Sequence, residues 1–125
     1  MRILLVEDHA DTARVYSQLL TSLGHAVRIA PDCQSARSAA RDFVFDLLIC
    51  DISLPDGDGR QLLPELRHLA HSRLPALAFS AYASAAEKDF ARMSGFDDFL
   101  AKPADFDQLM GILNKLARGN GHLRV

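Results

Sequence analysis

Short runs rich in apolar residues alternate along this chain with longer segments that have the apolar spacing of helices. The five runs are Ile3–Val6, Ala26–Ala30, Leu47–Cys50, Ala76–Phe79 and Asp98–Ala101. Short continuous apolar runs are typical of strands that are buried on both faces of a sheet. Strands that alternate with helices form a parallel sheet with right-handed crossovers, covered by helices on both sides. The sequence therefore predicts an α/β fold: a three-layer α/β/α sandwich built around a doubly wound, five-stranded (βα)5 parallel sheet.

The segments between these runs carry signals for the start and the end of helices. Asp32, Ser84 and Asp105 are expected to cap the second, fourth and fifth helices at their N-termini. Gly24 and Gly95 stand where the first and fourth helices are expected to stop. The residues expected to face the core are Tyr16, Leu19, Leu20 and Leu23; Cys33, Ala36, Ala40 and Phe43; Leu62, Leu63, Leu66 and Leu69; and Phe106, Leu109, Leu113 and Leu116.

Three features depart from this regular pattern. Residues 53–59 hold one proline and two glycines and are expected to form a loop. Pro64 is expected near the start of the third helix, where a missing N–H matters least. The fourth helix has the weakest apolar stripe, with Phe90 and Met93 as its main large members, so we expect it to be the easiest helix to displace.

Composition limits the class of protein. The 125 residues are 49% hydrophobic and 24% charged, as in an ordinary globular domain. Residues 1–118 are expected to form one domain, and residues 119–125 a flexible tail or linker stub. The net charge of −2 argues against a nucleic-acid surface, which would need an excess of basic residues.

The chain also lacks signals for a membrane or an oxidising compartment. No apolar run approaches the roughly 20 residues that a membrane span needs, and the N-terminus has no signal-peptide pattern. Cys33 and Cys50 lack the CxxC spacing and are expected to be reduced thiols in the core. These features predict a cytoplasmic protein without membrane contact.

Charged and polar side chains stand directly after four of the five expected strands. They are Glu7 and Asp8, Asp51, Ser80 and Lys102. Active sites in such sheets lie at the carboxyl ends of the strands, so we expect these side chains to meet. Three close carboxylates need counter-charge, which Lys102 and a hard divalent cation such as Mg²⁺ (or Mn²⁺) could supply. Asp51 is then a plausible nucleophile for a phosphoryl group, forming an aspartyl-phosphate, with Ser80 and Lys102 contacting the phosphoryl oxygens.

Over residues 2–117 this set resembles the receiver domains of bacterial response regulators. The resemblance rests on the acidic pair 7–8, the segment Asp51–Gly59, the Ser80–Ala81 step and Lys102–Pro103. It implies a flavodoxin-like strand order, 2-1-3-4-5, and phosphorylation of Asp51 by a histidine kinase or a histidine phosphotransfer protein. It also implies a protein that catalyses its own phosphotransfer and dephosphorylation, but that does not turn over free substrates.

The resemblance gives individual residues a role. Glu7, Asp8 and Asp51 would hold Mg²⁺ together with the backbone carbonyl of Ser53, with Glu7 acting through water. Ser80 matches the Ser/Thr switch residue, and Phe99 matches the aromatic residue that turns inward on activation. A downstream effector would bind the surface of the fourth helix, fifth strand and fifth helix. Serine in place of the commoner threonine, and Phe99 without a hydroxyl, would alter the strength of the switch.

The run from residue 78 to 83, with residues 96–98, is similar to receivers at the C-terminus of hybrid histidine kinases, and we predict that origin. Other functions fit parts of the pattern. An aspartate-nucleophile phosphatase usually has an acid two residues after the nucleophile, where this chain has Ser53. A flavodoxin-like FMN binder would need a Ser/Thr/Gly-rich loop after the first strand, where this chain is acidic. A pseudo-receiver, a docking module that is never phosphorylated, stays open.

Overall fold

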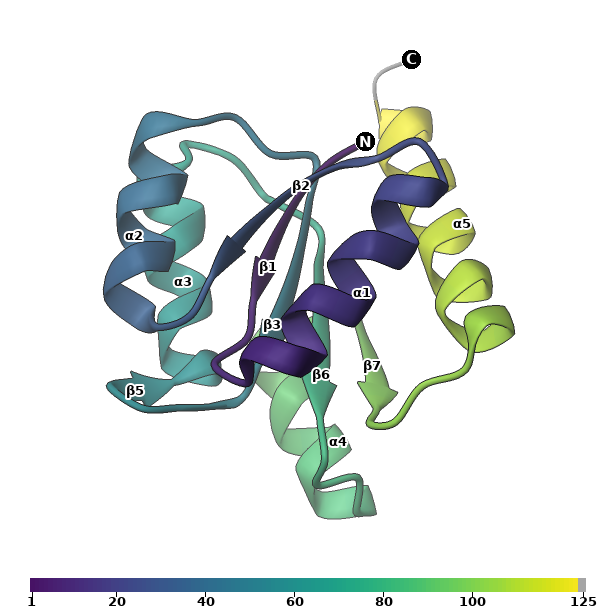
Figure 1. The fold of residues 1–125 in the computed structure, drawn as a ribbon. Helices are drawn as coiled ribbons and strands as arrows, with labels where there is room; N and C mark the ends of the chain where they lie inside the picture. Colours follow the sequence, from purple (N-terminus) through teal and green to yellow (C-terminus); the bar gives the residue numbers. More distant parts are fainter. Residues whose placement is uncertain (124–125) are drawn as a thin grey trace.

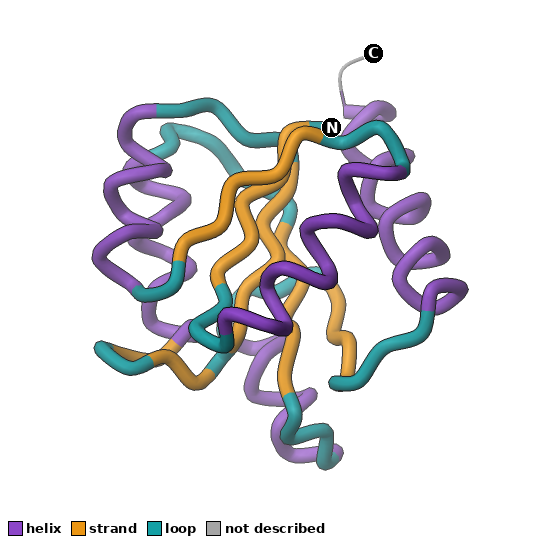
Figure 2. The backbone as a smooth tube through the Cα atoms, viewed as in Figure 1, coloured by secondary structure: helices purple, strands orange, loops and turns teal. Residues whose placement is uncertain are grey.

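The computed structural model describes the backbone of residues 1–123 and the side chains of residues 1–117. Five parallel strands form the central sheet (Figures 1 and 2). They are β1 (Arg2–Val6), β2 (Ala26–Ala30), β3 (Leu47–Asp51), β6 (Ala76–Ser80) and β7 (Asp98–Ala101). Their spatial order is β2-β1-β3-β6-β7, which confirms the predicted order of 2-1-3-4-5.

Five helices follow the strands of this sheet: α1 (Ala10–Ser22), α2 (Cys33–Asp42), α3 (Gly59–Leu69), α4 (Ala85–Met93) and α5 (Phe106–Leu123). Helices α1 and α5 cover one face of the sheet, and α2 and α3 cover the other (Figure 1). The predicted caps are present, since Asp32, Ser84 and Asp105 accept hydrogen bonds from backbone N–H groups three residues further on. The three-layer sandwich is therefore confirmed.

The core has one apolar cluster on each face of the sheet. On the α1 and α5 side, Ile3, Leu5 and Phe79 pack with Leu20 and Leu109. On the α2 and α3 side, alternate residues of β1, β3 and β6 join Ala30 of β2 in a cluster that includes both cysteines, which are buried and unbridged as expected. Because each central strand contributes to both clusters, its sequence is apolar throughout.

Two residues expected to face the core lie further out than predicted, and two large apolar residues of α4 are also exposed. Phe43 follows the last residue of α2, so it leaves the helix's inward face; it is 41% exposed, with the guanidinium of Arg28 4.0 Å from its ring centre. Phe106 stands in the first turn of α5, ahead of the first buried residue of that helix, and is 46% exposed. Phe90 and Met93 are 54% and 83% exposed. The expected inward positions of Phe43 and Phe106 were wrong, whereas the exposure of Phe90 and Met93 agrees with the weak apolar stripe expected of α4.

The segment after β3 is more ordered than a loop. Ser53–Leu54 (β4) and Gly57–Asp58 (β5) form a short antiparallel hairpin. Helix α3 then begins at Gly59, because the carboxylate of Asp58 caps it by accepting from the N–H of Arg60 at 2.8 Å. Pro64 is therefore inside the helix and not near its start, which corrects the prediction.

The last helix continues past residue 118, the expected end of the domain, as far as Leu123. The backbone of the expected tail, residues 119–125, is thus helical up to Leu123, and residues 124–125 lie outside the described residues. Within the described part of the chain, no helix has the length and apolar character needed to span a membrane.

Candidate functional site

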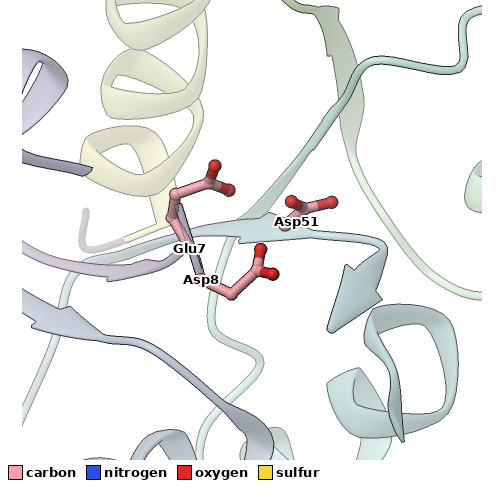
Figure 3. Close-up of side chains that lie close together, drawn as sticks. All are labelled: Glu7, Asp8 and Asp51. Atoms are coloured by element: carbon pink, nitrogen blue, oxygen red, sulfur yellow. The ribbon is translucent and has the colours of Figure 1, made fainter. Parts of the chain in front are cut away.

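Three carboxylates meet at the carboxyl edge of the sheet (Figure 3). Glu7 and Asp8 follow β1, and Asp51 is the last residue of the neighbouring strand β3. The strands pair with Val6 beside Cys50, so the register brings the next residues, Glu7 and Asp51, to the same edge. Each of the three residues offers an oxygen within 4.8 Å of the others. The convergence that the strand-end pattern predicted is present for these acids.

Lys102 joins two of these carboxylates. Its Nζ donates to both carboxylate oxygens of Glu7, at 2.8 and 2.7 Å, and to Oδ2 of Asp51 at 2.8 Å. The side chains of Glu7 and Asp51 are almost entirely buried, whereas Asp8 is exposed. Charged pairs removed from water in this way need close hydrogen bonds to be tolerated. Lys102 therefore fixes the two buried carboxylates relative to each other.

The position of Lys102 depends on two contacts of the segment that carries it. Its backbone N–H donates to the carbonyl of Ser80 at 2.9 Å, which continues the pairing of β7 with β6. The hydroxyl of Tyr16, on α1, donates to the carbonyl of Ala104 at 3.1 Å and accepts from its N–H at 2.9 Å. Both sides of the Lys102 turn are thus attached to regular elements.

Burial and close charges shift the proton affinities of the group. Burial, followed by hydrogen bonding with Asp51, raises the pKa of Glu7 to about 7, and the opposing effect of Lys102 does not cancel this. Burial on its own would lower the pKa of Lys102, but its bonds to Asp51 and Glu7 raise it above the usual value. Lys102 therefore stays protonated at neutral pH. An excess of carboxylate oxygens around one ammonium group is a donor set that suits a hard divalent cation.

The backbone around Asp51 is closely packed. The N–H of Ser53 donates to Oδ1 of Asp51 at 3.0 Å, and the N–H of Gly59 donates to the carbonyl of Ile52 at 2.7 Å. A Cβ on Gly59 would lie 2.3 Å from the carbonyl oxygen of Asp51, which no other residue could tolerate without a shift of the backbone. The first residue of the hairpin, Ser53, is therefore bonded to the carboxylate of Asp51, and the residue after the hairpin, Gly59, packs against the carbonyl of Asp51.

The two expected switch residues lie at different distances from this group. Ser80 ends β6, one residue beyond Phe79, which pairs with Asp51; it is buried, and its Oγ accepts from the N–H of Tyr82 at 3.0 Å. Phe99 is on β7 and lines a groove of about 320 Å³, together with residues of α4 and Lys115 of α5. The structure thus brings Glu7, Asp8, Asp51, Ser53 and Lys102 together, places Ser80 at the next strand end, and leaves Phe99 outside.

The sequence reasoning missed two residues that hold the site in place. One is Tyr16, for which a buried hydroxyl on an apolar helix face was the available signal. The other is Asp56, whose carboxylate accepts from the N–H groups of Cys33 at 2.7 Å and Gln34 at 3.1 Å, at the N-terminus of α2. These bonds, the one from Cys33 first, lower the pKa of Asp56. No local pattern distinguishes this aspartate from others in a turn-rich segment.

Comparison with known proteins places the chain among receivers. Residues 3–114 match the family model described as response regulator receiver domain. An uncharacterized 14.6 kDa protein of Leptolyngbya boryana is 34% identical over 116 residues, which are 92% of this chain and 88% of that protein. The signal transduction histidine-protein kinase BarA of Shigella flexneri is 30% identical over 122 residues, which are 97% of this chain but only 13% of the kinase. The transcriptional regulatory protein ZraR of Escherichia coli is 34% identical over 90% of this chain and 25% of its own length.

Solved structures agree with these matches. A response regulator receiver domain protein from Methanospirillum hungatei has a TM-score of 0.85 and 29% identity, and the match covers 97% of each chain. The receiver domain of the sensor histidine kinase PA1611 from Pseudomonas aeruginosa has a TM-score of 0.82 and 32% identity, covering 96% of this chain and 97% of that one. That structure holds a magnesium ion in its active-site cleft.

Proposed function

Because this chain belongs to the response regulator receiver domain family of two-component signalling, we propose that Asp51 accepts a phosphoryl group from a phosphohistidine of a histidine kinase or phosphotransfer protein. The observation that supports this best is the contact of Lys102 with Asp51 and Glu7 at the carboxyl edge. An aspartate held beside a protonated lysine is suited to phosphoryl transfer, in which charge must be offset around the transferred group.

The proposed transfer uses groups already in position. A carboxylate oxygen of Asp51 attacks phosphorus, the P–N bond to the donor imidazole breaks, and the bonding electrons stay with that nitrogen. The N–H of Ser53 orients the carboxylate through Oδ1, while Lys102 neutralises charge at Oδ2. The hydroxyl of Ser80 uses a lone pair for the N–H of Tyr82, so its own hydrogen can be donated to a phosphoryl oxygen.

The donor set also suits a resident cation. Asp8, Asp51 and the carbonyl of Ser53 would hold Mg²⁺ (or Mn²⁺), with Glu7 acting through water, since both oxygens of Glu7 accept from Lys102. When bound, such an ion offsets the negative charge of the phosphoryl oxygens. The magnesium in the receiver of PA1611 supports this part of the proposal.

The output of the domain would follow from a change of shape. Ser80 would bond to the phosphoryl group, Phe99 would turn inward, and the surface of α4, β7 and α5 would present a different face to an effector. Within a hybrid histidine kinase similar to BarA, the domain would work as one cytoplasmic part of a phosphorelay. It would act on its own acyl phosphate and not turn over free phosphomonoesters.

Labelling by a small phosphodonor tests the proposal. The wild-type protein, incubated with acetyl phosphate and Mg²⁺, should gain one phosphoryl group in intact mass, and Asp51→Asn should gain none. Asp11→Asn, which changes an exposed aspartate of α1, is the matched control and should label normally. Labelling of Asp51→Asn would remove Asp51 as acceptor. An unlabelled wild-type protein that still binds its kinase would favour the pseudo-receiver.

A further inference from the structure

Helix α4 is fastened strongly at its C-terminal end. Arg67 of α3 donates through Nη1 to the carbonyl of Gly95 at 2.9 Å and through Nη2 to Asp97 at 3.2 Å. Asp97 also accepts from the backbone N–H of Ala76 at 2.8 Å. Gly95 has a φ of +108°, a backbone conformation that residues with a side chain rarely adopt, so glycine is favoured at this end. The end of α4 is thus fixed to α3 and to the start of β6.

The remainder of α4 is held far more weakly. Only Ala91 is buried among the nine residues of the helix, and residues 81–86 before and within its first turn are exposed. In Figure 1, α4 projects beyond the ends of the other helices. A helix with so little buried apolar surface depends on its side contacts for its position.

One side chain from the first turn of α3 reaches this loosely held part. Nη1 of Arg60 lies 3.9 Å from Oε2 of Glu87, and its guanidinium lies 5.6 Å from the centre of the Phe90 ring. The Nε–Nη2 edge of the guanidinium is fixed by Asp58, which accepts from Nη2 at 2.8 Å and from Nε at 3.1 and 3.2 Å. Arg60 is therefore aimed at α4 by an ion pair within its own turn.

The backbone of Arg60 is in turn connected to Asp51. Its neighbour Gly59 packs directly on the carbonyl of Asp51, and the hairpin between them starts at the bond from Ser53 to the carboxylate of Asp51. A new group on that carboxylate would act on this hairpin through the bond to Ser53, then on Asp58 at the end of the hairpin, and through Asp58 on the guanidinium. This path to α4 does not pass through Ser80 or Phe99.

We propose that Arg60 is a latch that holds α4 in its resting position through Glu87 and Phe90 and reports the state of Asp51 to that helix. The inference rests on the proposed phosphorylation for its regulatory meaning, though the latch itself is a contact of the unmodified protein. An exposed ion pair and a distant cation–π contact are each weak, so the latch can open when the hairpin shifts. Arg60 is a positioning residue, because it acts through α4 and does not touch the phosphoryl group.

Hydrogen exchange of the unmodified protein tests the latch. Arg60→Gln and Glu87→Gln should each speed exchange of the amides of α4 by about two- to fivefold, with α2 and α5 unchanged. The double variant should exchange no faster than the faster single variant, since both remove one contact. Glu87→Gln keeps the bond between Asp58 and Arg60, so its effect cannot come from a damaged hairpin.

The matched control is Arg37→Gln, which breaks the exposed Arg37–Glu65 pair between α2 and α3 at 2.7 Å. Wild-type exchange in α4 of Glu87→Gln, or an equal increase in Arg37→Gln, would overturn the latch. Arg60→Lys keeps the charge but not the planar guanidinium. Its α4 amides should therefore exchange at a rate between those of wild type and Arg60→Gln.

Binding of beryllofluoride with Mg²⁺ tests the coupling to Asp51. In wild type, part of the binding free energy is used to release α4 from Arg60. Arg60→Gln and Glu87→Gln lack this contact, so they should bind the phosphoryl mimic about two- to fivefold more tightly than wild type. Equal affinities would overturn the coupling. A wild-type protein that neither binds the mimic nor labels with acetyl phosphate contradicts the proposed function, and the exchange experiment then still decides the latch.

Discussion

The carboxyl edge around Asp51 and helix α4 are held in opposite ways. At the edge, buried charges contact one another at 2.7–2.8 Å over a floor of strands whose residues are almost all buried. Helix α4 buries only Ala91, and ahead of its fixed C-terminal end it is contacted by Arg60, at 3.9 Å from Glu87 and 5.6 Å from the ring centre of Phe90. The contacts at the edge hold its side chains in one arrangement, whereas α4 can be displaced at a small cost in free energy. Such a division suits a molecule that receives a signal at one place and displays it at another.

The same substitution in the two regions gives the largest expected contrast. Phe79 is buried beneath the site, with its ring centre 4.9 Å from both Nζ of Lys102 and the ring of Tyr16, whereas Phe90 is 54% exposed on α4. Phe79→Ala should lower the free energy of unfolding by about 3–5 kcal/mol, and Phe90→Ala by less than about 1 kcal/mol. Urea denaturation measures both. Similar losses for the two variants would break the comparison.

Removal of the ammonium group of Lys102 is expected to have the next largest effect on stability. Lys102→Met leaves the carboxylates of Glu7 and Asp51 buried without their shared donor. The metal-free protein should lose about 2–4 kcal/mol at pH 8, since an uncompensated buried charge is costly. Lys115→Met is the control, because Lys115 pairs with Asp98 at 3.2 Å but is 68% exposed; its loss should stay below about 1 kcal/mol. Equal stability of Lys102→Met and wild type at pH 8 would show that the edge is not held by this contact.

The difference between the regions also explains what the sequence could predict. The edge was predictable because strand ends are marked by continuous apolar runs, and a parallel sheet brings those ends together. The helices and their N-terminal caps were also predictable, because a capping side chain such as Asp32 or Ser84 lies only a few residues from the N–H group that it accepts from. The side on which Phe43 and Phe106 lie was not, because it depends on where a helix ends relative to the sheet.

The contacts of Asp56, Arg60 and Arg67 also could not be predicted from the sequence. Each joins elements that are distant along the chain: the hairpin to α2, α3 to α4, and α3 to the start of β7. Their partners are backbone groups or ordinary surface acids, which carry no pattern of their own. A site formed by several polar residues at strand ends was thus easier to predict than a single side-chain contact between distant elements.

The pH dependence of stability gives the finest test of the edge. The pKa of Glu7 is raised from 4.5 to about 7 in the folded protein, mainly by burial. Between these values the folded state binds more protons than the unfolded state, so the free energy of unfolding falls as pH rises through this window. Glu7→Gln removes the titrating group and should make the metal-free protein about 1–3 kcal/mol more stable than wild type at pH 8, with a smaller difference at pH 4.

Urea denaturation of both proteins between pH 4 and pH 8, with a chelator present, measures this difference directly. Titrating groups outside the edge are common to the two proteins and cancel in the comparison, and Lys102, whose pKa is raised, does not titrate in this range. Asp56→Asn, outside the edge, is the control: the backbone N–H groups of Cys33 and Gln34 lower the pKa of Asp56, so its difference from wild type should not rise between pH 5 and pH 7.5. A difference between Glu7→Gln and wild type that stays constant over that range would mean that the buried carboxylate keeps its ordinary pKa. The contact with Lys102 would then outweigh burial, and the edge would hold its negative charge at no cost to folding.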